Sequence, residues 1–202
     1  MRYIPALFIL SVVALVLSIP THPNFAMVGQ LHRIDGGYGS ATPVKFSVDG
    51  FLVLTCEHVV SGLEADDPFT LTLNGVEYTD GMVVWSDVAA DTALVRFVST
   101  DRPALAVLTT MDPRPYSRGY AAGFPLGVDE LVVGDVLFQI SPSIISHLTG
   151  PGGSGGPVFD EFGRVCGIVS MIRTPQVSPY GRAYLGWITT ISLLDSVIEE
   201  LR

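Results

Sequence analysis

One serine in the chain is surrounded by glycines in a way that suits nucleophilic chemistry. Residues 149–159 read Thr-Gly-Pro-Gly-Gly-Ser-Gly-Gly-Pro-Val-Phe, with the serine at position 154. Glycine adopts backbone angles that other residues resist and lets a substrate approach the main chain closely. A serine on such a turn can present its hydroxyl while nearby N–H groups converge on one point, which supplies a nucleophile and an oxyanion hole together.

Two other readings of this segment are a flexible Gly/Ser linker and a phosphate-binding loop. The phosphate loop is disfavoured because no Lys-Ser/Thr pair follows the glycines and because Pro157 discourages a helix at that point. The linker is disfavoured only because a histidine and an acid in suitable contexts occur elsewhere in the chain.

A histidine and an acid occur in contexts that complete a catalytic set. An apolar, β-type run that starts at Phe51 ends in His58, and Asp91 directly precedes a second apolar run. A neutral imidazole takes the serine proton near pH 7, and a carboxylate holds its tautomer and stabilises the imidazolium. The sequence therefore predicts a Ser-His-Asp triad of Ser154, His58 and Asp91. Asp87 is the alternative acid, but it does not adjoin the apolar run.

These segments resemble the trypsin-like (chymotrypsin-fold) serine proteases, and most closely the protease domain of the HtrA/Deg branch. The resemblance covers the chain from about residue 29 to its C-terminus. It implies an all-β fold of two antiparallel six-stranded barrels with a short C-terminal helix, and activity as a serine endopeptidase. The motifs that carry it are Thr55-Cys-Glu-His-Val-Val, Asp91-Thr-Ala-Leu-Val, Ala121-Ala-Gly-Phe-Pro-Leu-Gly and Gly152-Gly-Ser-Gly-Gly-Pro.

The resemblance implies a role for each matching residue. Ser154 would be the nucleophile, His58 the general base and then acid, and Asp91 the carboxylate that orients His58. The backbone N–H groups of Gly152 and Ser154 would form the oxyanion hole, and the hydroxyl of Ser170 would support Asp91.

The resemblance also places the pocket for the substrate side chain before the cleaved bond (P1). No acid lies at its base, where cleavage after Lys or Arg would require one. Val169 and Ile172 indicate a small apolar pocket and cleavage after Val, Ala or similar residues. The residues expected to bind substrate are Leu148, Thr149, Val169, Ser170, Met171 and Ile172.

Three features depart from the pattern of the family, one of them being that no PDZ domain is expected after the protease domain. The residue before the nucleophile is Gly153, where digestive proteases carry an aspartate that pairs with a newly freed N-terminus. Activation by such a cleavage is therefore not expected. Cys56 and Cys166 do not match the disulfide beside the catalytic histidine, and they are expected either as two buried thiols or, in an oxidising compartment, as a disulfide.

The pattern of the remaining chain agrees with an all-β domain. Short β-branched runs are punctuated by Gly and Pro, which is typical of an antiparallel sandwich or barrel. Asn74-Gly75 lies between two alternating runs and predicts a type I′ hairpin. Apolar residues at helical spacing over 193–201 predict a closing helix.

The N-terminal segment has a composition of its own. Residues 3–19 carry no charge and Arg2 precedes them, which is consistent with either a signal peptide or a short membrane anchor. We therefore divide the chain into a leader over 1–28 and a protease domain over 29–202. The positive charge keeps the N-terminus cytoplasmic, so the domain is expected to be secreted, or anchored on the non-cytoplasmic side of a membrane.

Charge and ligand patterns limit the partners. The net charge of −9 disfavours nucleic acid, and the chain has no Cys/His cluster at zinc spacing and no Ca²⁺-loop pattern. We expect a protein or peptide substrate, no metal and no cofactor, and the sequence leaves the oligomeric state open. The alternatives are a protease that cuts only its own precursor or one partner, and a non-catalytic binding module on the same fold.

Overall fold

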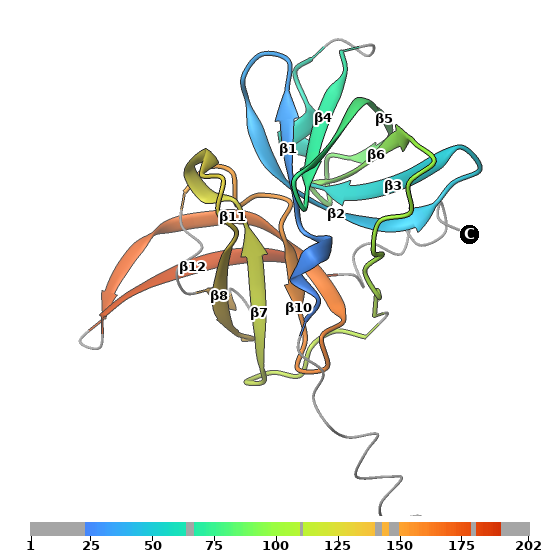
Figure 1. Cartoon of the computed structure of the whole chain (residues 1–202). Helices are drawn as coiled ribbons and strands as arrows, with labels where there is room; N and C mark the ends of the chain where they lie inside the picture. The colour runs from blue at the N-terminus through green and yellow to red at the C-terminus, as the bar shows by residue number, and fades with distance from the viewer. Residues whose placement is uncertain are drawn as a thin grey trace, which may run out of the picture.

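The computed structural model describes residues 23–63, 67–109, 111–139, 143–145, 150–178 and 181–190. These residues form two closed antiparallel barrels of six strands each. Figure 1 shows how the two barrels are arranged. The strand orders are β1-β2-β3-β6-β5-β4 and β10-β11-β12-β9-β8-β7. This arrangement confirms the predicted all-β fold of two barrels.

The first six strands of the chain form one barrel and the next six form the other, and the paired strands within each barrel are antiparallel. The first barrel contains β1 (Gly29–Arg33), β2 (Tyr38–Phe46), β3 (Gly50–Thr55), β4 (Phe69–Leu73), β5 (Val76–Asp87) and β6 (Thr92–Val98). The second contains β7 (Arg118–Gly123), β8 (Val132–Leu137), β9 (Ser143–Ile145), β10 (Pro157–Phe159), β11 (Val165–Ser178) and β12 (Gly181–Thr190). The short helical elements are η1 (Phe25–Met27), α2 (Glu57–Val60) and η2 (Pro125–Gly127).

The core of the first barrel is centred on aromatic rings. The rings of Phe51 on β3 and Phe97 on β6 stack with centroids 5.7 Å apart, and the ring of Tyr78 on β5 meets Phe51 edge-on at 5.0 Å. Both phenylalanines are fully buried. Residues on a strand alternate between the two faces of a sheet, so the neighbour Val98 points outward and is 62 % exposed.

The hairpin predicted at Asn74-Gly75 is present between β4 and β5. Both residues have positive φ angles, 52° for Asn74 and 76° for Gly75. That combination defines a type I′ turn, whose twist matches the twist of the flanking strands. The prediction is confirmed.

The folded unit begins before the boundary that the sequence suggested. Gly29 is the first residue of β1, but the preceding turn η1 already packs on both barrels. The ring of Phe25 meets the rings of Tyr120 and Phe159 of the second barrel edge-on, at 6.4 and 5.6 Å. In the first barrel, the hydroxyl of Thr42 donates to the carbonyl of Met27 (2.8 Å). Residues 25–28 therefore belong structurally to the domain.

Two of the expected segments lie outside the described residues, namely the apolar run over 3–19 and the helix over 193–201. Within the part of the chain that the structure describes, none of the helices combines the length and the apolar composition needed to cross a membrane.

We predict that Phe97→Ala destabilises the protein by about 3–5 kcal/mol, because it removes a fully buried ring that stacks on Phe51. Val98→Ala, one residue further along the same strand, is the control and should change stability by no more than about 0.5 kcal/mol. Urea unfolding followed by circular dichroism measures both. Equal losses in the two variants would show that this ring stack does not hold the first barrel together.

Candidate active site

The register of two paired strands brings His58 and Asp91 together. Strand β3 pairs with β6 so that Thr55 lies opposite Ala93. His58 follows β3 on the short helix α2, and Asp91 directly precedes β6. In an antiparallel pair the end of one strand lies beside the start of the other, so both residues lie at the same end of the first barrel.

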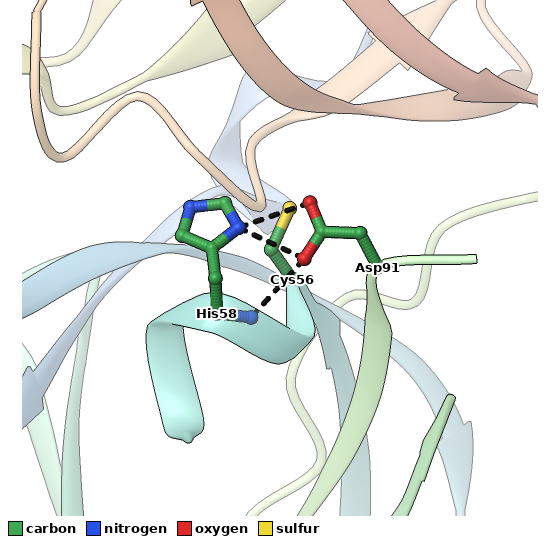
Figure 2. A group of neighbouring side chains, drawn as sticks. All are labelled: Cys56, His58 and Asp91. Atoms are coloured by element: carbon green, nitrogen blue, oxygen red, sulfur yellow. Dashed lines mark hydrogen bonds and ion pairs between the residues drawn. The ribbon is translucent and has the colours of Figure 1, made fainter. Parts of the chain in front are cut away.

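The Asp91 carboxylate contacts His58 with both oxygens (Figure 2). The Nδ1 atom of His58 lies 2.8 Å from Oδ1 and 2.9 Å from Oδ2 of Asp91, and the backbone N–H of His58 donates to Oδ1 at 3.1 Å. An ionised carboxylate can only accept, so Nδ1 carries the hydrogen and Nε2 is left free to accept a proton. The hydroxyl of Ser170, on β11 of the second barrel, donates to Oδ2 of Asp91.

This contact shifts the pKa of both groups. The hydrogen bond that His58 donates to Asp91 raises the pKa of His58 above its ordinary value, partial burial opposes this rise, and the charges of Asp91 and Glu57 add to it. Partial burial alone would raise the pKa of Asp91, but the hydrogen bonds from His58 and Ser170 outweigh it and hold that pKa below its usual value. Both effects favour the charged forms of the pair.

Asp91 and Asp87 occupy different positions in the turn that connects β5 to β6. Asp91 has a left-handed backbone, with φ of 49°, and its N–H donates to the carbonyl of Val88 at 3.3 Å. Asp87 accepts hydrogen bonds from the N–H groups of Ala89 and Ala90, at 2.8 and 3.1 Å. Asp87 therefore closes the turn, while Asp91 faces His58.

Ser154 reaches the same place from the second barrel. It lies on the glycine-rich turn that precedes β10, and its Oγ lies 3.4 Å from the carbonyl oxygen of Ser170, to which it donates. Ser154 and His58 line one cavity of about 190 Å³ between the β1–β2 hairpin, α2 and the glycine-rich turn. Other residues that line this cavity are Arg33, Tyr38, Val59 and Gly152.

Gly152 stands where no other residue fits. Its φ is 96°, a left-handed conformation that L side chains rarely adopt. A Cβ at this position would also collide with the carbonyl oxygen of Phe124 and with the ring of Tyr38. The turn thus needs glycine here for both conformational and steric reasons.

The structure tests only some of the residues predicted to form the substrate pocket. Leu148 and Thr149 lie outside the described residues. The side chain of Val169 is fully buried in the core of the second barrel, so in this structure it supports β11 and is out of reach of a substrate. Its carbonyl oxygen accepts hydrogen bonds from the N–H of Gly155 (2.8 Å) and from the thiol of Cys56 (3.2 Å).

The three residues that follow lie on β11. Ser170 is half-buried and uses its hydroxyl for Asp91, as the resemblance implied. Met171 and Ile172 pair with Trp187 and Gly186 of β12 through the backbone. Their contribution to a substrate pocket remains a prediction.

Cys56 forms a compact cluster with His58 and Asp91 (Figure 2). One ligand-type atom from each of the three residues lies within 4.8 Å of the others, and Cys, His and Asp are all metal ligands. Hydrogen bonds account for this arrangement, because the thiol donates to Val169 and the imidazole is held by the carboxylate. Burial and the nearby Asp91 raise the pKa of the Cys56 thiol well above its usual range, whereas a metal ligand must be a thiolate. The Cys56 thiol therefore keeps its proton, which does not fit a metal ligand.

The second cysteine is also a buried free thiol. Cys166 donates to the carbonyl of Val158 at 3.4 Å, and burial raises its pKa, with the charge of Asp160 adding to the rise. Cys56 and Cys166 therefore have separate partners, in agreement with the alternative of two thiols.

Three residues of this region were missed from the sequence. Arg33 donates to the carbonyls of Val59 (3.2 Å) and Ser61 (3.0 Å) and so stabilises the end of the helix that carries His58. Tyr38 covers Gly152, and Ser40 is bonded to the glycine-rich turn. The only signal available was the pair of small residues, Gly39-Ser40, inside an otherwise β-type run.

We predict that Asp91→Asn lowers the pKa of His58, because the charged hydrogen-bond acceptor is the main cause of its rise. Titration of the His58 ring protons by NMR, assigned with His58→Ala, should show a midpoint above that of a free histidine in the parent and a lower midpoint in the variant. Asp87→Asn removes a charge from the same turn without touching His58 and should leave the midpoint in place. An unchanged midpoint in Asp91→Asn would contradict the assigned hydrogen bond.

Comparisons with known proteins agree with the resemblance to the HtrA/Deg branch. The family model described as "Trypsin-like peptidase domain" matches residues 41–168. A "Probable periplasmic serine endoprotease DegP-like" of Halomonas elongata is 28 % identical over 77 % of the chain and 34 % of the relative. A protein of the same name from Marinomonas sp. is 30 % identical over the same shares. "Protease Do-like 1, chloroplastic" of Arabidopsis thaliana is 27 % identical over 81 % of the chain and 39 % of the relative.

A solved structure shares the fold. The serine endoprotease from Yersinia pestis superposes with a TM-score of 0.66 at 21 % identity, covering 91 % of this chain and 68 % of that one. The chain spans 34 % to 39 % of the length of the curated relatives named above. Together with the two-barrel fold, the match of the family model over residues 41–168 shows that the chain belongs to the trypsin-like peptidase family.

Proposed function

We propose that this chain is a serine endopeptidase of the HtrA/DegP type that uses Ser154, His58 and Asp91 as its catalytic triad. The observation that carries the proposal is the contact of both Asp91 oxygens with Nδ1 of His58, on a histidine that lines one cavity with Ser154. This contact leaves Nε2 of His58 as the nitrogen that can take the serine proton.

The reaction follows from these positions. The Oγ of Ser154 attacks the carbonyl carbon of the substrate, and its proton passes to Nε2 of His58. His58 then gives that proton to the leaving amine as the peptide C–N bond breaks, which leaves an acyl group on Ser154. Water then gives a proton to His58 and attacks the acyl carbon, the bond from that carbon to Oγ of Ser154 breaks, and Oγ takes the proton back from His58 as the second product leaves. Because the base must be neutral, the raised pKa of His58 moves the loss of activity on acidification to a higher pH than for a free histidine.

The backbone N–H groups of Gly152 and Ser154 are the proposed donors to the oxyanion. The left-handed backbone of Gly152, a conformation open to glycine, supports this role because it turns successive N–H groups toward one side of the chain. Each such donor contributes about 10²–10³ in kcat in comparable enzymes.

Cleavage after small apolar residues and a location outside the cytoplasm also belong to the proposal. The location rests on relatives that are named periplasmic and on the charge pattern of the N-terminal segment. A digest of a broad peptide library tests the P1 preference, which would be wrong if cleavage followed charged or large aromatic residues.

We predict that a fluorophosphonate probe adds once to the parent chain and not to Ser154→Ala, because the reaction needs both an activated serine and an oxyanion hole. Intact-mass analysis of the 202-residue protein measures the adduct. The absence of an adduct on a folded parent would contradict the endopeptidase and favour a binding module. An adduct without cleavage of the peptide library would indicate a protease restricted to its own precursor or one partner.

We predict that Gly152→Ala lowers kcat/KM about 10²-fold or more, since the new Cβ would displace the proposed oxyanion donors. Gly75→Ala is the matched control. Gly75 also has positive φ (76°), but nothing lies within 4 Å of the position of its Cβ. Both variants bear the cost of a left-handed alanine, about 1–2 kcal/mol of stability, and only Gly152→Ala should lose activity. Comparable kcat/KM values in the two variants would remove Gly152 from the proposed site.

A further inference from the structure

We propose that Ser40 is a positioning residue that fixes the orientation of the glycine-rich turn over 152–154, and through it the oxyanion hole. This inference rests on the proposed function. Ser40 lies on β2 of the first barrel, is fully buried, and meets the turn with both its backbone and its side chain.

Two hydrogen bonds tie Ser40 to the ends of the turn. Its backbone N–H donates to the carbonyl of Ser154 at 2.8 Å, and its Oγ donates to the carbonyl of Gly152 at 2.7 Å. A peptide group is planar, so the direction of the Gly152 carbonyl sets the plane shared with the N–H of Gly153. Anchoring the two carbonyls thus restricts the rotations that would turn the N–H groups of this segment away from the site.

The turn depends on such outside anchors because it contains little that could hold it from within. Gly152 and Gly153 have no side chains and can adopt many backbone conformations. Further bonds run from the N–H of Gly155 to the carbonyl of Val169 and, within the glycine-rich segment, from the N–H of Gly156 to the carbonyl of Gly153 (3.1 Å). The Ser40 hydroxyl is the side-chain anchor of the Gly152 carbonyl, and the N–H of Leu126 holds the carbonyl of Pro151, the residue before Gly152.

The same hydroxyl also accepts a hydrogen bond from the second barrel. The N–H of Phe124 donates to Ser40 Oγ at 2.9 Å, and close by the N–H of Leu126 donates to the carbonyl of Pro151 at 2.5 Å. One buried hydroxyl therefore links β2, the glycine-rich turn and the segment before η2. Removing it leaves the buried Gly152 carbonyl and the part-buried N–H of Phe124 without this partner, which favours opening of the turn.

The test compares Ser40→Ala with Thr42→Val. Thr42 is also a fully buried hydroxyl on β2 that donates to a backbone carbonyl, but its partner is Met27, away from the turn. We expect Ser40→Ala to lower kcat about 10- to 100-fold with KM within about twofold, as for a misplaced catalytic group. The acid limb of the pH profile should stay in place, because His58 and Asp91 are untouched. Thr42→Val should lose stability and keep kcat.

Amide hydrogen exchange at residues 152–154, measured by NMR, does not depend on activity. We expect exchange at these amides to rise about tenfold or more in Ser40→Ala relative to Thr42→Val, because local opening of the turn becomes easier. Unchanged exchange would overturn the positioning role even if the parent proved inactive toward the fluorophosphonate. Equal kcat in Ser40→Ala and the parent would overturn it while leaving the endopeptidase intact.

Ser40→Cys serves if Ser40→Ala does not fold. A thiol is a weaker donor of similar size, so the same changes are expected in the same direction but smaller. Wild-type exchange and kcat in a folded Ser40→Cys would count against the inference.

Discussion

The site depends on the Asp91 carboxylate being surrounded by donors from both barrels. His58 approaches it with a ring nitrogen and a backbone N–H, and Ser170 approaches it from β11 with its hydroxyl. An ionised carboxylate that is partly removed from water needs such donors to remain charged. The same hydrogen bonds that keep Asp91 ionised therefore also set the tautomer of His58, and the one from Ser170 connects the two barrels.

Other contacts between the barrels converge on the same region. Cys56 and Gly155 donate to one carbonyl, that of Val169, so the segment before His58 and the turn after Ser154 share an anchor. Ser40 makes the equivalent connection on the other side of Ser154. These bonds are buried, where the loss of a partner is costly, and they leave little freedom for the groups that face the cavity. Rigidity of this kind is what the proposed chemistry requires, since catalysis depends on reacting groups that are already in place.

Much of this could be anticipated from local sequence. The hairpin at Asn74-Gly75 follows from residues that tolerate positive φ, and the barrels follow from alternating runs broken by Gly and Pro. The preference for Asp91 over Asp87 also rested on a local feature, the apolar run after Asp91. Local patterns did not reveal that η1 packs on both barrels, because this packing depends on contacts with distant strands. They also did not reveal that the side chain of Val169 faces a core, because this depends on which face of β11 the barrel encloses.

The sequence by itself determined the fold class, the family resemblance and the residue types available for chemistry, because each of these is written in short motifs and in local periodicity. Only the tertiary structure decided which groups meet. The separation along the chain is 112 residues between Ser40 and Gly152, and 79 between Asp91 and Ser170. No local pattern encodes such a pairing, because it follows from barrel closure and from the packing of one barrel against the other. The buried hydroxyl of Ser40 and the thiol of Cys56 therefore acquire their partners only when both barrels have formed.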